Sequence, residues 1–192
     1  MKPVQAAGLR EVLLDPVEAA LFEVEGVSQA AVLVPLHERD GQLFAVLTRR
    51  HDDLRQHAGQ IAFPGGRVDP ADSGLVETAL REAREEIGLP REAVTLLGAL
   101  TPVYVQVSGF ALYPFVGAIE RPEVWTIAPI EVQFVLELAL GALASSYAVQ
   151  TLRRGEREVV TPTFAADTET IWGATARILE DLLTRMRLLE SA

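Results

Sequence analysis

Several apolar runs along the chain have the length of β-strands. Two apolar runs, at residues 29–36 and 43–48, flank a polar segment that contains Asp40 and Gly41, a pair typical of tight turns. We therefore expect a β-hairpin over this part of the chain. Further strands are predicted at residues 94–100 and 112–119, and a second hairpin at residues 147–152 and 158–163.

Helical patterns occur between and after these strands. Asp15 followed by Pro16 is typical of the cap and first turn of a short helix. Residues 75–87 have the helical period and are followed by a glycine suited to end a helix. Two more helices are predicted at residues 129–144 and about 168–190, and the apolar stripe of the last should face the core or a dimer partner. Alternating strand and helix signals favour an α/β fold.

Length and composition narrow the class of protein. We take residues 1–192 as a single domain, since this length suffices for a sizeable core. The 17 basic and 27 acidic side chains give a net charge of −10, which argues against nucleic acid as a partner. There is no cysteine, so disulfides and thiolate chemistry are excluded. The N-terminal segment lacks the apolar core of a secretory signal, and the apolar residues 132–149 contain Gln133 and Glu137. We therefore expect a cytoplasmic protein without a membrane span.

The clearest chemistry lies where the glycine pair Gly65-Gly66 leads into an acidic helix. Each helical residue turns by about 100°, so Glu82, Glu85 and Glu86 share one stripe beside the apolar face. Like charges at this spacing would destabilise the helix by ~1 kcal/mol in total, so a cation is expected to offset them. Carboxylates suit Mg²⁺ or Mn²⁺, and glycine backbone can approach a metal or a phosphate closely.

This segment, over about residues 65–89, resembles the Nudix box, a pattern of glycine, acid and arginine residues at fixed spacing. The matching residues are Gly66, Arg81, Glu82, Ala83, Glu85, Glu86, Gly88 and Leu89. The chain departs from the pattern at Asp72, which stands where the family has a glutamate and lies one residue further from Arg81. In the family this acid helps to orient the arginine, and the sequence leaves open whether Asp72 does so.

A basic segment, residues 46–66, leads into the glycine pair of this otherwise acidic chain. Arg50 and Arg55 could grip phosphate, because guanidinium groups bind phosphate oxygens through forked hydrogen bonds. Alternatively, they could be surface charges that pair with Asp52 and Asp53. Residue types alone do not decide between these interpretations.

The same basic segment resembles the signature of the coenzyme A pyrophosphatase branch of the Nudix family. The matching residues are Leu47, Thr48, Arg50, Arg55, Gly59, Phe63, Pro64, Gly65 and Gly66, with Val46 at the first leucine. Residues 170–176 also resemble the closing segment of that branch. His51 and His57 lie within the basic segment, and we assign neither of them a role.

The resemblance implies a Nudix-type α/β/α sandwich with a mixed β-sheet and metal-dependent hydrolysis of a diphosphate. The implied ligands of Mg²⁺ or Mn²⁺ are Glu82, Glu85, Glu86 and the backbone of Gly66. The implied catalytic residues are Glu85, Glu86 and Arg81, with Arg81 orienting the glutamates. The implied substrate-binding residues are Arg50, Arg55 and Gly65.

The resemblance to the branch also implies a substrate, coenzyme A, cut into 3′,5′-ADP and 4′-phosphopantetheine. Two alternatives stay open: another nucleoside diphosphate such as ADP-ribose, NADH or diadenosine polyphosphate, and a nucleotide-binding regulator without activity. The net charge disfavours RNA as a substrate. The oligomeric state is open, with a homodimer as one alternative.

Three residues outside these motifs have two interpretations each. Glu131 is either a fourth acid near the metal or a helix cap. Tyr104 and Phe110 either pack in the core or lie against an adenine ring.

Overall fold

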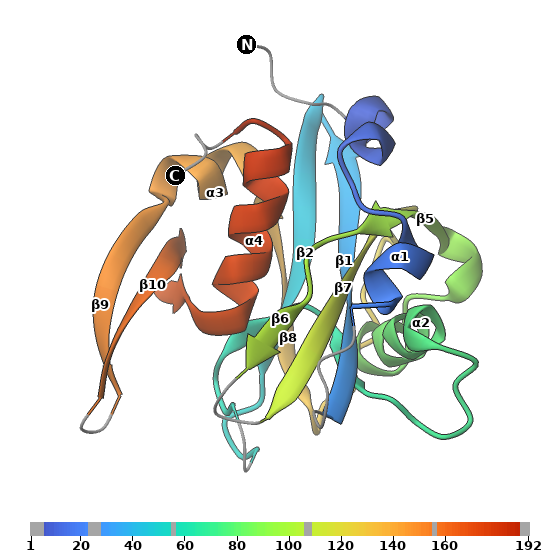
Figure 1. Cartoon of the computed structure of the whole chain (residues 1–192), viewed down its shortest axis with the longest axis horizontal. Helices are drawn as coiled ribbons and strands as arrows, with labels where there is room; N and C mark the ends of the chain where they lie inside the picture. Colours follow the sequence, from blue (N-terminus) through green and yellow to red (C-terminus); the bar gives the residue numbers. More distant parts are fainter. Residues whose placement is uncertain (1–5, 23–27, 55–56, 106–108, 155–156, 189–192) are drawn as a thin grey trace.

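A mixed β-sheet lies between two layers of helices in the computed structural model, which describes residues 6–22, 28–54, 57–105, 109–154 and 157–188. Helices α1 (Pro16–Ala20) and α2 (Leu75–Ile87) cover one face of the sheet, and α4 (Gly173–Arg185) covers the other (Figure 1). This arrangement confirms the α/β/α sandwich. Asp15 caps α1 as expected, because its Oδ1 accepts hydrogen bonds from the backbone N–H groups of Val17 and Glu18.

The sheet combines parallel and antiparallel pairs. Strand β1 (Ser28–Arg39) runs parallel to β7 (Phe110–Ile119), whereas β2 (Gln42–Arg50) is antiparallel to β1. The remaining strands of this sheet are β3 (Ile61–Ala62), β4 (Gly65–Arg67), β5 (Val94–Ala99), β6 (Val103–Val105) and β8 (Val132–Ala139). The first hairpin is confirmed, and its turn has positive φ at both Asp40 and Gly41.

The glycine pair sits in a gap between β1 and β2. These two strands pair only near their turn, from Leu36 and Ala45 to Arg39 and Gln42. Beyond that point β3 pairs with β2 and β4 pairs with β1, so residues 61–67 fill the space between them. The sheet therefore holds Gly65 and Gly66 at a fixed place, directly beside α2.

Two hydrophobic clusters hold the layers together. On one face, side chains of α2 pack against β1 and β7; this cluster includes Ala79, Ala83, Ile87, Leu33, Tyr113 and Phe115. On the other face, side chains of α4 pack against β1, β2 and β10; this cluster includes Ile178, Leu179, Leu182, Val34, Leu47 and Phe164. The apolar stripe of the last helix is thus part of the core.

The prediction of one helix over residues 129–144 is wrong. Residues Val132–Ala139 form β8, which pairs with β2, and only Leu140–Ser146 are helical, as α3. The start of the last helix is also later than expected, because Glu169–Ile171 form β11 against β10. At β8, pairing with the distant strand β2 overrides a local helical pattern, whereas β11 pairs with the strand that immediately precedes it, β10.

A smaller sheet stands beside the main one. Strands β9 (Ala148–Arg154) and β10 (Arg157–Ala166) form the second predicted hairpin, and β11 extends it. Short 3₁₀ turns occur at η1 (Ala6–Glu11) and η2 (Arg91–Ala93). Among the described residues, we find no helix with the length and apolarity that crossing a membrane requires.

Candidate active site

Helix α2 begins and ends where the sequence predicts. Gly88 terminates it in the left-handed conformation, with φ of 68°, and its N–H donates to the carbonyl of Arg84 at 3.0 Å. Ala83 and Ile87 are fully buried against the sheet. This packing fixes the rotation of the helix and turns its acidic stripe towards the glycine pair.

Arg81 is held by the carboxylate that replaces the expected glutamate. Its Nε lies 2.8 Å from Asp72 Oδ1 and its Nη2 lies 3.0 Å from Asp72 Oδ2, a bidentate pair. Asp72 Oδ2 also accepts from the Thr78 hydroxyl at 2.7 Å and from the Asp69 N–H at 2.9 Å. These hydrogen bonds, those from Arg81 above all, hold the pKa of Asp72 well below its usual range. Asp72 therefore contacts the arginine despite its different spacing.

The other guanidinium nitrogens of Arg81 reach the acidic stripe and the glycine loop. Nη1 donates to Glu82 Oε1 at 2.8 Å and to Glu85 Oε2 at 3.1 Å. Nη2 also donates to the backbone carbonyl of Arg67, at 3.1 Å. One arginine thus links the acid helix to the strand that carries Gly66.

Glu86 is the most buried acid of the stripe, with 3% of its surface exposed. Burial raises its pKa to about 8; the charges of Glu82 and Glu131 add to the rise, and Arg50 opposes it. Arg50 Nη1 lies 3.8 Å from Glu86 Oε1, too far for a hydrogen bond. Arg50 and a hydrogen bond from the Gly65 backbone both favour the charged form of Glu86, but they offset the cost of burial only in part.

Glu82 lies against the glycine pair. A Cβ atom at Gly66 would come within 2.4 Å of Glu82 Oε1, so a side chain there would displace the carboxylate. Burial raises the pKa of Glu82, Glu85 and Glu131 add to the rise, and the hydrogen bond from Arg81 opposes it. The conformation of Glu82 thus requires a residue without a side chain at position 66.

Glu85 and Glu131 complete the group of acids. The Glu85 side chain is 52% exposed, and its ion-pair partner among the described residues is Arg81. Glu131 lies in the segment before β8, and its backbone carbonyl accepts from the His51 N–H at 2.9 Å. No helix begins at Glu131, so the helix-cap interpretation is wrong. Its charge instead contributes to raising the pKa of Glu82 and of Glu86.

The donor atoms of this group suit a divalent cation. Within the described residues, no three acidic or histidine side chains already converge on one metal position. Arg81 occupies one oxygen each of Glu82 and Glu85. Burial, together with repulsion from neighbouring acids, raises the pKa of Glu82 and Glu86, and a divalent ion would favour their charged forms. Hard carboxylate oxygens beside a glycine backbone fit Mg²⁺ or Mn²⁺.

Two neighbouring arginines of β2 have different surroundings. Arg49 forms ion pairs with Asp52 at 3.0 Å and with Glu169 at 3.1 Å, and it donates a hydrogen bond to Gln133. Arg50 points towards Glu86, and its buried Nε has no hydrogen-bond partner among the described residues. The proposed pairing of Arg50 with Asp52 is therefore wrong, and Arg50 keeps donors available for a ligand. Arg55 lies outside the described residues.

The rest of the basic segment has structural contacts. His51 Nδ1 lies 3.5 Å from Asp53 Oδ2, and His57 Nδ1 lies 2.9 Å from Gln60 Oε1. The Thr175 hydroxyl, in the closing segment, donates to the carbonyl of Ile61 at 3.1 Å. Helix α4 thus supports the strand that precedes the glycine pair.

The sequence of this chain resembles those of known proteins. The NUDIX domain model matches residues 27–127. The uncharacterized Nudix hydrolase NudL of Salmonella paratyphi B is 41% identical over 157 residues, covering 80% of each chain, and that of Salmonella newport is equally similar.

Two solved structures share the fold. A NUDIX hydrolase from Nitrosomonas europaea has a TM-score of 0.53 and 16% identity, covering 86% of this chain and 73% of that one. An Ap4A hydrolase from C. elegans has a TM-score of 0.50 and 21% identity, covering 59% of this chain and 81% of that one.

The chain therefore belongs to the Nudix family. It is a hydrolase of phosphorus-containing anhydrides, and such enzymes generally use divalent metal ions.

Proposed function

We propose that the protein is a cytoplasmic enzyme that hydrolyses the diphosphate bond of coenzyme A or its derivatives, giving 3′,5′-ADP and 4′-phosphopantetheine. The observation that carries this proposal is the signature running from Leu47 to Gly66, which resembles the coenzyme A pyrophosphatase branch. Of its members, Leu47, Thr48 and Arg50 belong to β2, and Gly65 and Gly66 belong to β4. The proximity of Arg50 Nη1 to Glu86 Oε1, 3.8 Å apart, supports the proposal.

In this proposal Glu82, Glu85, Glu86 and the backbone of Gly66 hold Mg²⁺ or Mn²⁺. When bound, the metal would lower the pKa of a water molecule and neutralise charge on the phosphoryl oxygens. Glu85, whose side chain is half-exposed, or Glu86 accepts the proton of the attacking water. Arg81 keeps the carboxylates in position through its bonds to Asp72, Glu82 and Glu85.

The arginines and glycines of the basic segment bind the diphosphate. The Arg50 side chain is partly exposed and lies near Glu86 without a hydrogen bond to it, so its guanidinium can donate to a phosphate oxygen. At Gly65 there is no room for a side chain, because a Cβ atom would come within 2.4 Å of the carbonyl oxygen of Ala31. In this proposal the Gly65 backbone itself contacts the phosphate. Arg55 is a second phosphate ligand in this proposal.

The deciding experiment compares coenzyme A with ADP-ribose, NADH and Ap4A at equal concentration, with Mg²⁺ or Mn²⁺ added. We expect the highest kcat/KM with coenzyme A, and products with the masses of 3′,5′-ADP and 4′-phosphopantetheine. Higher kcat/KM with one of the other compounds would reassign the substrate. Absence of any product would favour a nucleotide-binding regulator.

A further inference from the structure

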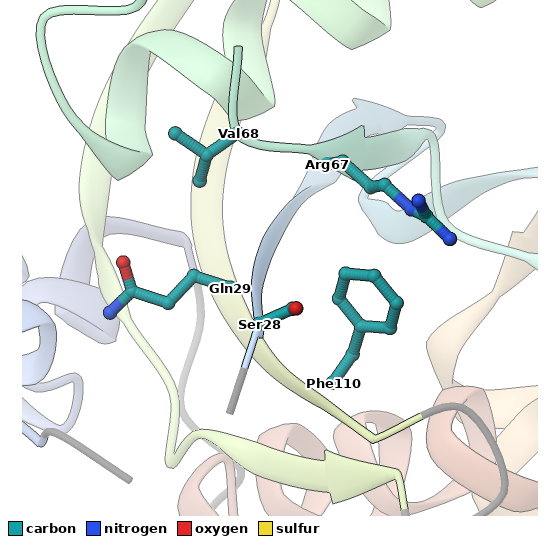
Figure 2. Close-up of a pocket in the computed structure, with 5 residues that line it drawn as sticks. All are labelled: Ser28, Gln29, Arg67, Val68 and Phe110. Atoms are coloured by element: carbon teal, nitrogen blue, oxygen red, sulfur yellow. The ribbon is translucent and has the colours of Figure 1, made fainter. Parts of the chain in front are cut away.

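A pocket of about 380 Å³ opens where β1 and β7 begin and β4 ends. Its lining residues are Ser28, Gln29, Arg67, Val68 and Phe110 (Figure 2). Volumes of this size are typical of small-molecule sites. None of these residues belongs to the acidic stripe, and the motifs of the sequence assign none of them a role.

Arg67 and Phe110 lie against each other at this pocket, and we call this pair of side chains the platform. The guanidinium carbon of Arg67 lies 4.6 Å from the centroid of the Phe110 ring, within the range of a cation–π contact (Figure 2). Arg67 is exposed, and within the described residues no carboxylate pairs with its side chain. An accessible cation of this kind in a chain of net charge −10 favours a ligand that is anionic or rich in π electrons.

The pocket and the candidate active site share the strand β4. Arg67 follows Gly66 in β4, and its carbonyl accepts a hydrogen bond from Arg81 Nη2 at 3.1 Å. A substrate whose diphosphate lies at Gly65 and Gly66 therefore has one of its two end groups within reach of Arg67. The structure thus offers this end group a site of its own.

We propose that this pocket binds the purine base of the substrate, stacked on Arg67 and Phe110; this inference rests on the proposed function. Aromatic rings and guanidinium planes stack on nucleobases because each presents a flat face. A pantetheine arm is a flexible chain without such a face and gains nothing from the platform. The Ser28 hydroxyl, on the same side as Phe110 in Figure 2, can hydrogen-bond to the edge of the base.

Of the two aromatic residues that the sequence suggested for an adenine, Phe110 is the one that lines the pocket. Tyr104 is 46% exposed on β6 and pairs with Ala111, next to Phe110, but it does not line the pocket. Tyr104 therefore provides a matched control for the loss of an aromatic ring.

The test is calorimetric binding of AMP and of ribose 5-phosphate, which lacks the base, to the wild type and to Phe110→Leu, Arg67→Gln and Tyr104→Leu. Loss of the stacking platform should weaken AMP binding about tenfold in Phe110→Leu and Arg67→Gln. Tyr104→Leu should bind AMP like the wild type, and Phe110→Leu should bind ribose 5-phosphate like the wild type. Equal thermal midpoints would show that the variants are folded.

Wild-type protein that fails to bind millimolar AMP, or binds it equally well without Phe110 and Arg67, would overturn the base pocket. Hydrolysis of coenzyme A is measured separately, so the two proposals can fail independently. AMP binding that requires Phe110 in a protein that cleaves no diphosphate would support the pocket and overturn the proposed function. If the protein cleaves coenzyme A but its AMP affinity does not depend on Phe110 or Arg67, the proposed function is supported and the base pocket is overturned.

Discussion

Asp72 and Arg81 form a bidentate ion pair, with Nε to Oδ1 at 2.8 Å and Nη2 to Oδ2 at 3.0 Å. The Asp72 side chain is 3% exposed, so the pair is shielded on the acid side. Because the same guanidinium also holds Glu82 and Glu85, the position of the acidic stripe depends on a residue that the family pattern does not contain. An aspartate thus occupies the position of a glutamate, with one additional residue before the arginine.

Replacing Asp72 with Asn should lower both stability and turnover. The amide of Asn is neutral and has a single acceptor oxygen, so it cannot replace the bidentate ion pair with Arg81. The free energy of unfolding should therefore fall by about 2 kcal/mol. Turnover should fall about tenfold or more, because Arg81 would hold Glu82 and Glu85 less firmly. Urea unfolding and kcat measure the two effects.

Asp53→Asn is the matched control, since the Asp53 side chain is 93% exposed and should tolerate the same change. Wild-type turnover in Asp72→Asn would contradict the positioning role of this ion pair.

The two glycines should fail in different ways when replaced by Ala. At Gly66 the new Cβ meets the Glu82 carboxylate, which can move, so activity should fall while stability changes little. At Gly65 it meets the backbone of Ala31 and Val32 within 2.6 Å, which cannot move cheaply, so stability should fall as well. Thermal midpoints and kcat distinguish the two outcomes.

Gly141→Ala, where nothing lies within 4 Å, controls for the substitution itself. Equal losses of stability at Gly65 and Gly66 would contradict a specific contact between Gly66 and Glu82.

Arg50→Lys should raise KM for the diphosphate about tenfold with a smaller effect on kcat, because lysine cannot make the forked contact to phosphate. Arg49→Lys makes the same chemical change one residue away. Arg49 joins Asp52, Gln133 and Glu169, so we expect a lower thermal midpoint and a nearly unchanged KM. Steady-state kinetics of both variants provide the measurement, and an equal rise of KM in both would remove the special role of Arg50.

His37 should make the protein less stable in mild acid. It is buried beside Glu137, with 3.2 Å between Nε2 and Oε2, and burial together with Arg121 and Arg39 lowers its pKa although Glu137 opposes this. The folded protein therefore binds fewer protons than the unfolded chain below about pH 6.5. Stability should fall as pH drops below that value, by up to about 1.4 kcal/mol per pH unit for one group.

Urea unfolding at pH 7.5 and 5.5 measures this effect. His37→Gln should lose less stability between the two values than the wild type does. His57→Asn, at an exposed position, should retain the wild-type pH dependence. An identical loss in His37→Gln would assign the acid sensitivity to other groups.

The elements that could be predicted from the sequence are those with a local pattern, such as a helical period, a glycine cap or a turn pair. Helix α2 and its end at Gly88 follow from periodicity and a glycine cap, and the first hairpin follows from Asp40 and Gly41. The strand β8 could not be recognised, because its partner β2 lies far away in sequence and its residues also fit a helical pattern. Likewise, only the tertiary structure shows that Arg49 pairs with Asp52 whereas Arg50 lies near Glu86. It also brings Glu131 near Glu86.

The central claim is that Glu82, Glu85 and Glu86 hold a divalent ion against a diphosphate, and binding of Mn²⁺ tests it most directly. Affinity for Mn²⁺ should be measured by calorimetry in the wild type, in Glu86→Gln, and in Glu77→Gln as a control on the same helix, with turnover followed in parallel. We expect Glu86→Gln to bind Mn²⁺ at least about tenfold more weakly and to lose turnover almost entirely, with its fold intact and Glu77→Gln unaffected. Mn²⁺ affinity and turnover in Glu86→Gln equal to those of the wild type would contradict the claim.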